Sequence, residues 1–226
     1  MKKLLPKLII SVVGALLFAC SKPTLSPDQM DKSPFTGVPC AAPCWHGLVV
    51  GESSENNVMS TLPTLTFIDQ NTIQVFRGSR PTINYETFAP GAEITASCVQ
   101  PKQQCLSLTV ADDILTNIVV ILNYEMRVDE AIGYLGDPDY IGYQDLGAER
   151  IICEVNLIWS SKQLVLASAR FEGLNAVEDN CGVIRDTGKI APSLLVSEAR
   201  YGSSTAIETL LSASSGESFE FSGTIP

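Results

Sequence analysis

Histidine is almost absent from this chain: His46 is the only one in 226 residues. A Ser-His-Asp hydrolase needs a histidine as its general base, so an enzyme of that kind would have to use this residue. The sequence has no G-x-S-x-G motif, which presents the serine in many hydrolases, and Cys44 and Trp45 crowd His46. We therefore expect His46 to be structural and expect no catalytic residue.

Positive charge is also scarce, with 15 Lys and Arg against 25 Asp and Glu. Removing residues 1–19, which contain three lysines and no acid, lowers the formal net charge from −10 to −13. Nucleic acids and anionic headgroups are bound by clustered Lys and Arg. The composition therefore predicts a soluble domain with no nucleic-acid partner.

Long hydrophobic runs are missing too. The run Leu8–Phe18 contains eleven residues, whereas a membrane-spanning helix needs about 20. Its length and the lysines before it (Lys2, Lys3 and Lys7) are typical of a signal peptide, whose apolar region has about 7–15 residues. The sequence predicts a signal peptide over residues 1–19.

The residues at the end of this run, Leu17-Phe18-Ala19-Cys20, resemble the bacterial lipobox. In lipobox proteins the cysteine thiol receives diacylglycerol, the signal is cut before it, and the new amine often receives a fatty acid such as palmitate. The resemblance implies lipidation of Cys20, and two or three acyl chains make a firm anchor. A plain secretory signal with a coincidental cysteine is the alternative. Ser21, in place of Asp, favours the outer membrane over the cell membrane; either way the protein would face outward from the cytoplasm.

Six further cysteines follow the anchor, an even number that favours disulfides in an exported protein. Proximity in sequence suggests the pairs Cys40–Cys44, Cys98–Cys105 and Cys153–Cys181 among 15 connectivities. The middle pair carries a conflict, because Cys105 shares its strand phase with Ser107, opposite Leu106. That bridge requires strand pairing to stop before the two cysteines.

The C-x3-C spacing of Cys40 and Cys44 also occurs in copper-delivering, thioredoxin-like lipoproteins. Copper delivery there needs thiolates at a helix start and a distant histidine, yet no histidine follows Cys44. We expect a disulfide, no metal and no cofactor.

Four segments are expected along the chain. Residues 1–19 form the signal peptide, and residues 20–39, rich in Ser, Pro and Asp, read as a flexible lipidated tether. An α+β domain spans residues 40–215 and begins near Cys40, and residues 216–226 are a tail.

Periodicity within this domain predicts antiparallel sheets and two or three short helices. Ser53 or Ser54 begins a helix that Pro63 stops, without the Glu or Gln of a full capping box. A second helix runs from Arg127 to Leu135. The expected strands are Leu65–Ile68, Thr72–Phe76, Ile94–Val99, Cys105–Ala111, Ile114–Leu122 and the hairpin of Cys153–Trp159 with Gln163–Phe171. A loop over residues 173–190 and an amphipathic stretch over Ser204–Leu211 follow.

Two segments look like one unit used twice, each with a helix followed by strands. The second helix ends in Leu135-Gly136-Asp137-Pro138, and a Leu-Gly-x-Pro helix end before a β-meander resembles the modules of SmpA/OmlA-type envelope lipoproteins and of β-lactamase-inhibitor proteins. Pro43-Cys44-Trp45-His46-Gly47 is similar to the Pro-Cys-Trp-x-Gly start of uncharacterised bacterial lipoproteins. These resemblances cover about fifty residues. They imply a non-catalytic module that binds proteins.

Acidic residues are paired at Asp112-Asp113, Asp129-Glu130, Asp137/Asp139 and Glu178-Asp179. The first pair is explained by a turn and the second by a helix start, and Asp137-Pro138-Asp139 lacks the pattern of a calcium loop. Trp45 and Trp159 could line a recognition surface. Tyr134, Tyr140 and Tyr143 cluster around the Gly136 turn and form the one specific candidate surface for a partner.

The sequence therefore predicts a lipid-anchored envelope module that binds another envelope protein or has a structural role. A small-ligand-binding or sensing lipoprotein is the alternative, ahead of a hydrolase.

Overall fold

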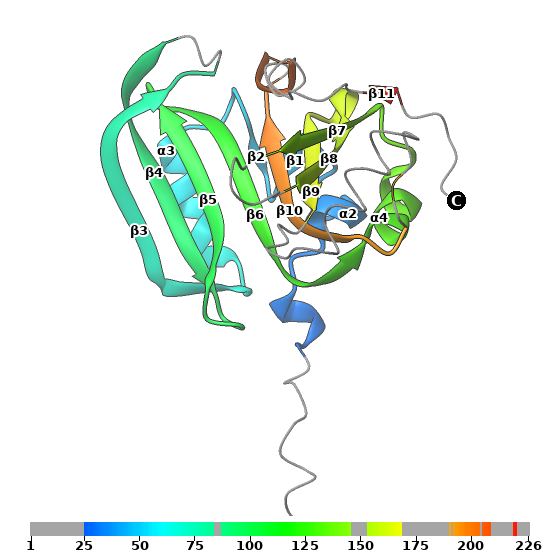
Figure 1. Cartoon of the computed structure of the whole chain (residues 1–226). Coiled ribbons are helices and arrows are strands. Elements are labelled where there is room, and N and C mark those ends of the chain that lie inside the picture. Colours follow the sequence, from blue (N-terminus) through cyan, green and yellow to red (C-terminus); the bar gives the residue numbers. More distant parts are fainter. Residues whose placement is uncertain are drawn as a thin grey trace, which may run out of the picture.

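The structure is a computed structural model that describes residues 25–83, 87–145, 153–168, 190, 192–203, 205–208 and 219–220. Its centre is a nine-stranded antiparallel sheet in the order β11-β7-β8-β9-β10-β6-β5-β4-β3 (Figure 1). The strands are β1 (Cys44–Trp45), β2 (Leu48–Val49), β3 (Ile68–Pro81), β4 (Phe88–Cys98), β5 (Gln104–Ala111), β6 (Ile114–Arg127), β7 (Tyr140–Asp145), β8 (Cys153–Trp159), β9 (Leu164–Ser168), β10 (Leu195–Gly202) and β11 (Phe219–Glu220). The helices are η1 (Pro27–Gln29), α2 (Ser33–Thr36), α3 (Glu55–Thr61), η2 (Leu62–Thr64), α4 (Val128–Leu135) and η3 (Ser160–Lys162). This confirms the predicted α+β class with antiparallel sheets.

The sheet is built from two halves with the same order of elements. In the first half α3 precedes the meander β3–β6, and in the second α4 precedes β7, β8, β9 and β10. The last strands of the halves, β6 and β10, pair antiparallel at the centre of the sheet. The unit expected twice in the sequence thus occurs twice as a topology, and a sequence repeat stays a prediction.

One face of the first half is apolar and covered. Alternate residues of β4, such as Ala92, Ile94 and Ala96, are buried, and β5 and β6 continue the row with Leu106, Leu108, Ile118 and Val120. Helix α3 and the β1–β2 hairpin cover this face, fixed by two backbone hydrogen bonds, from Gly51 N to Leu115 O and from Leu115 N to Ser53 O, each 2.8 Å. The period of two therefore identified β4, β5 and β6 correctly as strands.

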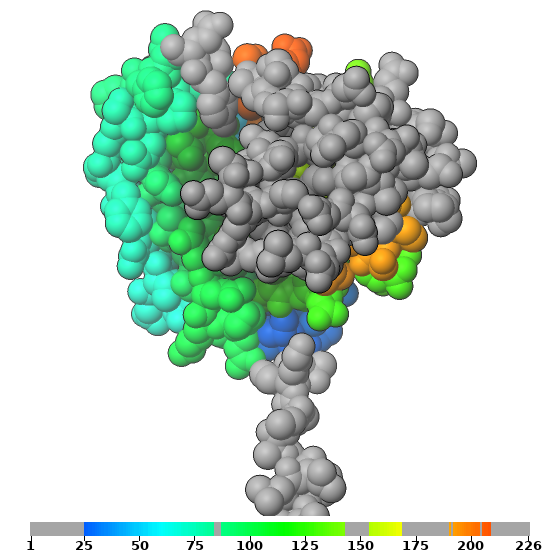
Figure 2. Space-filling model, viewed as in Figure 1, coloured from blue at the N-terminus to red at the C-terminus, as the bar shows by residue number. Residues whose placement is uncertain are grey.

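The opposite face of the same strands is polar and partly exposed. It carries Glu93, Thr95, Ser107, Thr109 and Asn117 at paired positions. Figure 2 shows the surface of β4–β6 set back behind a rim formed by β3. A face of this kind needs no cover, which explains the alternation of apolar and polar residues in these strands.

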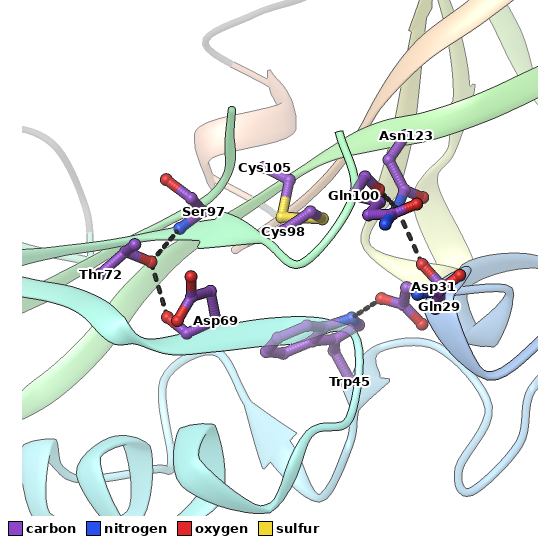
Figure 3. The surroundings of a disulfide bond; sticks show 10 residues. All are labelled: Gln29, Asp31, Trp45, Asp69, Thr72, Ser97, Cys98, Gln100, Cys105 and Asn123. Carbon is purple, nitrogen blue, oxygen red and sulfur yellow. Dashed lines mark hydrogen bonds between the residues drawn. A yellow bond between two sulfur atoms is a disulfide. The ribbon is translucent and has the colours of Figure 1, made fainter. Parts of the chain in front are cut away.

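The predicted pair of short strands around residues 69–71 is wrong. A single strand, β3, spans Ile68–Pro81 and carries an irregularity, because Asp69 pairs with Ser97 but Gln74 pairs with Thr95. At this break the Thr72 hydroxyl accepts a hydrogen bond from Ser97 N at 2.8 Å, in place of a backbone partner (Figure 3). The polar Asp-Gln-Asn triplet forms a bulge rather than a turn.

The disulfides Cys40–Cys44 and Cys98–Cys105 are both formed. The conflict of strand phase at Cys105 is resolved by a bulge: Leu106 pairs with Ala96 and Gln104 pairs with Ser97, so Cys105 is an extra residue in its strand. Both Cys105 and Leu106 are therefore buried. The sequence-based argument required strand pairing to stop before these cysteines, whereas in the structure the pairing continues through the bulge. Cys181 and the side chain of Cys153 lie outside the described residues, so their pairing stays a prediction.

The expected start of the folded region near Cys40 is wrong. Residues 25–39 pack against the domain, with Asp31, Ser33 and Phe35 buried. Asn123 Nδ2 donates hydrogen bonds to Gln29 O (2.8 Å) and Gln100 O (2.7 Å), and it thereby joins the N-terminal segment to the β4–β5 loop (Figure 3). The composition of residues 20–39 predicted a flexible tether. The residues that hold this segment, such as Asn123, are distant in sequence, so the composition of the segment could not reveal them.

Both main helices lie where they were predicted. Ser54 caps α3, and Asn57 completes the capping box: Ser54 N donates to Asn57 Oδ1 at 2.9 Å and Asn57 N to Ser54 Oγ at 3.2 Å. An asparagine thus supplies the interaction that we expected only from Glu or Gln. Helix α4 ends at Gly136, which has a φ of 78°.

The predicted β8–β9 hairpin is confirmed, with Gln163 in the left-handed region after η3. Residues 205–208 are helical, within the predicted amphipathic stretch, and Ile207 is buried. Of the loop expected over residues 173–190, only residue 190 is described, and of the tail only 219–220. In the parts of the chain described here, no helix is long and apolar enough to cross a membrane.

Candidate functional site

An open cavity lies at the end of the first half, where the β3–β4 and β5–β6 turns meet the start of α3. It is a shallow cavity of about 620 Å³, lined by Glu55, Arg77, Gly78, Ser79, Phe88, Ala89, Pro90, Gly91, Asp112 and Asp113. We call this set the turn-end cavity.

Its backbone frame depends on close packing of β4 on β5. A Cβ atom at Gly91 would lie 2.0 Å from Val110 O, so only glycine fits there. Asp112 and Asp113 both have positive φ, 52° and 59°, as the β5–β6 turn requires. Asp112 N donates to Pro90 O at 2.9 Å. This acidic pair is thus a turn, as predicted.

Charge in the turn-end cavity is internally paired. Arg77 donates to both carboxylate oxygens of Glu55, with Nη1 at 2.6 Å from Oε2. This pairing raises the pKa of Arg77 above its ordinary value. The backbone N–H of Glu55 donates to Asp113 Oδ1 at 3.1 Å. The ion pair therefore ties α3 to β3 and leaves the cavity acidic on balance.

Phe88 is the most exposed large apolar side chain described, at 69%. It lies in the cavity wall at the start of β4, whereas Phe76, 49% exposed, lies further along β3, where it pairs with Glu93. Strand pairing places Phe88 on the α3 side of the sheet and Phe76 on the polar side. The two rings therefore do not share one surface, and Phe88 alone is the exposed aromatic ring beside the cavity, a typical feature of a contact surface.

The only histidine is held by a buried carboxylate. His46 Nε2 lies 3.1 Å from Asp31 Oδ1. The other carboxylate oxygen, Asp31 Oδ2, accepts a hydrogen bond of 2.7 Å from Trp45 Nε1 (Figure 3). The rings of Trp45 and Phe67 lie 4.9 Å and 5.6 Å from the imidazole ring. Asp31 thus fastens the Pro-Cys-Trp-x-Gly segment to the N-terminal segment, a structural arrangement.

Of the predicted tyrosine surface, Tyr134 and Tyr140 are described, and they lie apart. Tyr134, 57% exposed, lies on α4 with its ring centre 6.4 Å from that of Phe35. Tyr140 packs with Ile158, Val165 and Ile207 on the other face of the sheet. The side chain of Tyr143 lies outside the described residues. Trp45 and Trp159 are buried, so neither lines a surface.

The other acidic residues singled out in the sequence have structural roles wherever the structure describes them. Glu130 Oε2 accepts from Arg127 N at the start of α4, and Asp139 Oδ2 accepts from Ser160 N at 2.7 Å. Glu178 and Asp179 lie outside the described residues, as does Cys20. No group of three or more His, Cys, Asp or Glu within the described ranges could hold a metal ion.

Sequence reasoning missed a buried charge network. Arg200 of β10 donates to Glu154 of β8 at 2.8 Å and to Glu198 at 2.7 Å. Burial opposes the charge of Arg200, but the hydrogen bonds that it donates to Glu154 and the charge of Glu198 raise its pKa. Arg200 and Glu154 are 46 residues apart, so no local pattern in the sequence could have revealed this ion pair.

Comparison of the chain with protein-family models, with curated proteins and with solved structures finds no match.

Proposed function

We propose that the chain is a lipid-anchored envelope protein that binds another protein through the turn-end cavity. Lipidation at Cys20 rests on the lipobox resemblance. All contacts described above lie at or beyond residue 25, so removal of residues 1–19 would leave them in place.

The observation that carries the binding role is the exposure of Phe88 beside the open cavity. Exposed aromatic rings contribute much of the binding energy at protein interfaces. A catalytic role has little support, because the single histidine is held by Asp31 and packed against Trp45 and Phe67.

A small-ligand-binding lipoprotein is the second candidate. The cavity volume of about 620 Å³ lies within the ~300–1,000 Å³ typical of ligand pockets. Its open, charged lining favours a protein over a small molecule, since ligand pockets are mostly enclosed and apolar.

The anchor is tested by replacing Cys20 with serine. Cys20→Ser should abolish labelling of the protein by radioactive palmitate and leave the heavier, uncleaved precursor, because both acylation and cleavage need the thiol. Palmitate labelling that persists in the variant would contradict lipidation at Cys20.

The binding surface is tested by photo-crosslinking in cells. A photoreactive phenylalanine analogue at position 88 should capture one stoichiometric envelope protein, whereas the same analogue at exposed Lys102 should not. Equal capture at both positions would contradict the cavity as the binding site. Absence of any captured protein would favour the small-ligand alternative.

A further inference from the structure

The N-terminal segment fixes how this domain can sit on a membrane. The described fold begins at residue 25, so a lipidated Cys20 would be separated from it by residues 21–24 only. Five residue steps span at most about 18 Å when fully extended. The predicted 20-residue tether would have allowed far more freedom.

The entry point of the chain into the fold is held at one end of the molecule. Thr66 Oγ1 donates to Asp28 O at 3.0 Å, and Asn123 joins Gln29 to Gln100. Figure 1 shows η1 beside the β4–β5 loop at the lower end of the sheet. Residues 25–30, 63–66 and 99–104 form this end, which we call the entry end.

The turn-end cavity lies at the opposite end. Strand β4 runs from Phe88 in the cavity to Cys98 beside the entry end, ten residue steps. At about 3.4 Å per residue the two ends are ~34 Å apart. This separation exceeds the reach of the short link.

The charges of the two ends differ as well. The three segments of the entry end contain one acid, Asp28, and one base, Lys102. The cavity end contains Glu55, Asp112 and Asp113 against Arg77. Bacterial membrane surfaces are anionic, and such a surface repels acidic groups within about 10 Å. In a chain whose net charge is −13 without residues 1–19, the nearly neutral end is the one that an anionic surface repels least.

We infer that the entry end faces the lipid bilayer at short range and that the turn-end cavity points away from it. The inference rests on the proposed lipid anchor at Cys20. The cavity is then presented to partners in the aqueous space rather than to components within the membrane.

The test uses the lipidated full-length protein in vesicles of phosphatidylethanolamine and phosphatidylglycerol. A fluorescent donor is attached at Lys102→Cys, in the entry end, or at Ser79→Cys, in the cavity wall, and an acceptor dye is placed on the lipid headgroups. Energy transfer should be at least twofold higher from position 102 than from position 79. Equal or reversed transfer would overturn the orientation.

A variant with a longer link between Cys20 and the fold tests the orientation independently of the lipid anchor. Insertion of twenty Gly and Ser residues between Thr24 and Leu25 should lower transfer from position 102 while the protein stays on the vesicles. Unchanged transfer from position 102 would show that the short link does not set the distance. Loss of vesicle binding by the unmodified lipidated protein, by contrast, would contradict the proposed anchor itself.

Discussion

Two tyrosines near the N-terminal segment differ in how their hydroxyl groups are satisfied. Tyr124 donates to Asp31 O at 2.8 Å. Tyr201 is 1% exposed, and its hydroxyl has no hydrogen-bond partner within the described structure. A buried polar group without a partner contributes no stability to offset its lost hydration.

We expect Tyr124→Phe to lower the free energy of unfolding by about 1 kcal/mol, since it leaves the carbonyl of Asp31 without its donor. Tyr201→Phe should be neutral or stabilising, because it removes only an unpaired hydroxyl. Urea unfolding followed by tryptophan fluorescence measures both variants. Equal destabilisation by the two changes would contradict this assignment.

The same tyrosines predict a loss of stability at alkaline pH. Burial, with the charge of Asp31, raises the pKa of both Tyr124 and Tyr201 well above the ordinary value of about 10. Above pH ~10 the unfolded state loses these protons while the folded state keeps them, so the free energy of unfolding falls as pH rises. Below pH ~10 the two states bind the protons equally and the effect vanishes.

Absorbance at 295 nm during an alkaline titration should therefore show two tyrosines that ionise only as the protein unfolds. Tyr201→Phe should reduce this late fraction by one tyrosine. A titration in which all tyrosines ionise before unfolding would rule out the raised pKa values.

At the scale of elements, β3 is an edge strand of 14 residues, the kind of surface that recruits other strands. Arg80 protects it: the guanidinium folds back over Gly78 and donates to Phe76 O at 2.9 Å and Ser79 O at 3.1 Å. The bulge near Thr72 disrupts the other end of the strand. Charged residues and bulges at edges oppose edge-to-edge pairing.

Replacing Arg80 with alanine should therefore increase self-association, because the outward-facing carbonyl of Ser79 and the exposed ring of Phe76 become free to meet another strand. Sedimentation velocity at several concentrations would show a dimer or larger species. Arg77→Ala is the control, since Arg77 binds Glu55 rather than this carbonyl, and it should stay monomeric. A monomeric Arg80→Ala protein would contradict the protective role.

At the scale of the whole molecule, the N-terminal segment belongs to the folded unit. Phe35 is 3% exposed, and the Asp31 carboxylate accepts hydrogen bonds from Trp45 and Ser33 N. Burial of one phenylalanine contributes about 1.5–3 kcal/mol, and loss of Asp31 would leave the indole N–H of Trp45 unpaired.

A soluble protein that begins at residue 25 should therefore keep the stability of one that begins at residue 20. One that begins at residue 40 should lose at least ~3 kcal/mol or fail to fold. Thermal and urea unfolding would compare the three. Equal stability of all three would restore the predicted tether over residues 20–39.

The sequence alone determined what depends on neighbouring residues. Alternating apolar residues identified β4, β5, β6 and β8, and Ser54, Pro63 and Gly136 marked the ends of α3 and α4. Two disulfides followed from proximity in the chain. These features depend on side-chain spacing and local backbone preference, which a short window of sequence contains.

The tertiary structure decided everything that depends on distant partners. Asp31 is buried because Trp45 and Tyr124, 14 and 93 residues away, use its oxygens. The bulge at Cys105 depends on its pairing with β4, and the position of β10 beside β6 joins the two halves. The exposure of the Phe88 side chain likewise depends on how the elements around it pack in the folded chain. Such outcomes depend on which long-range pairs satisfy buried polar groups and cover apolar surface, and no local pattern encodes those pairs.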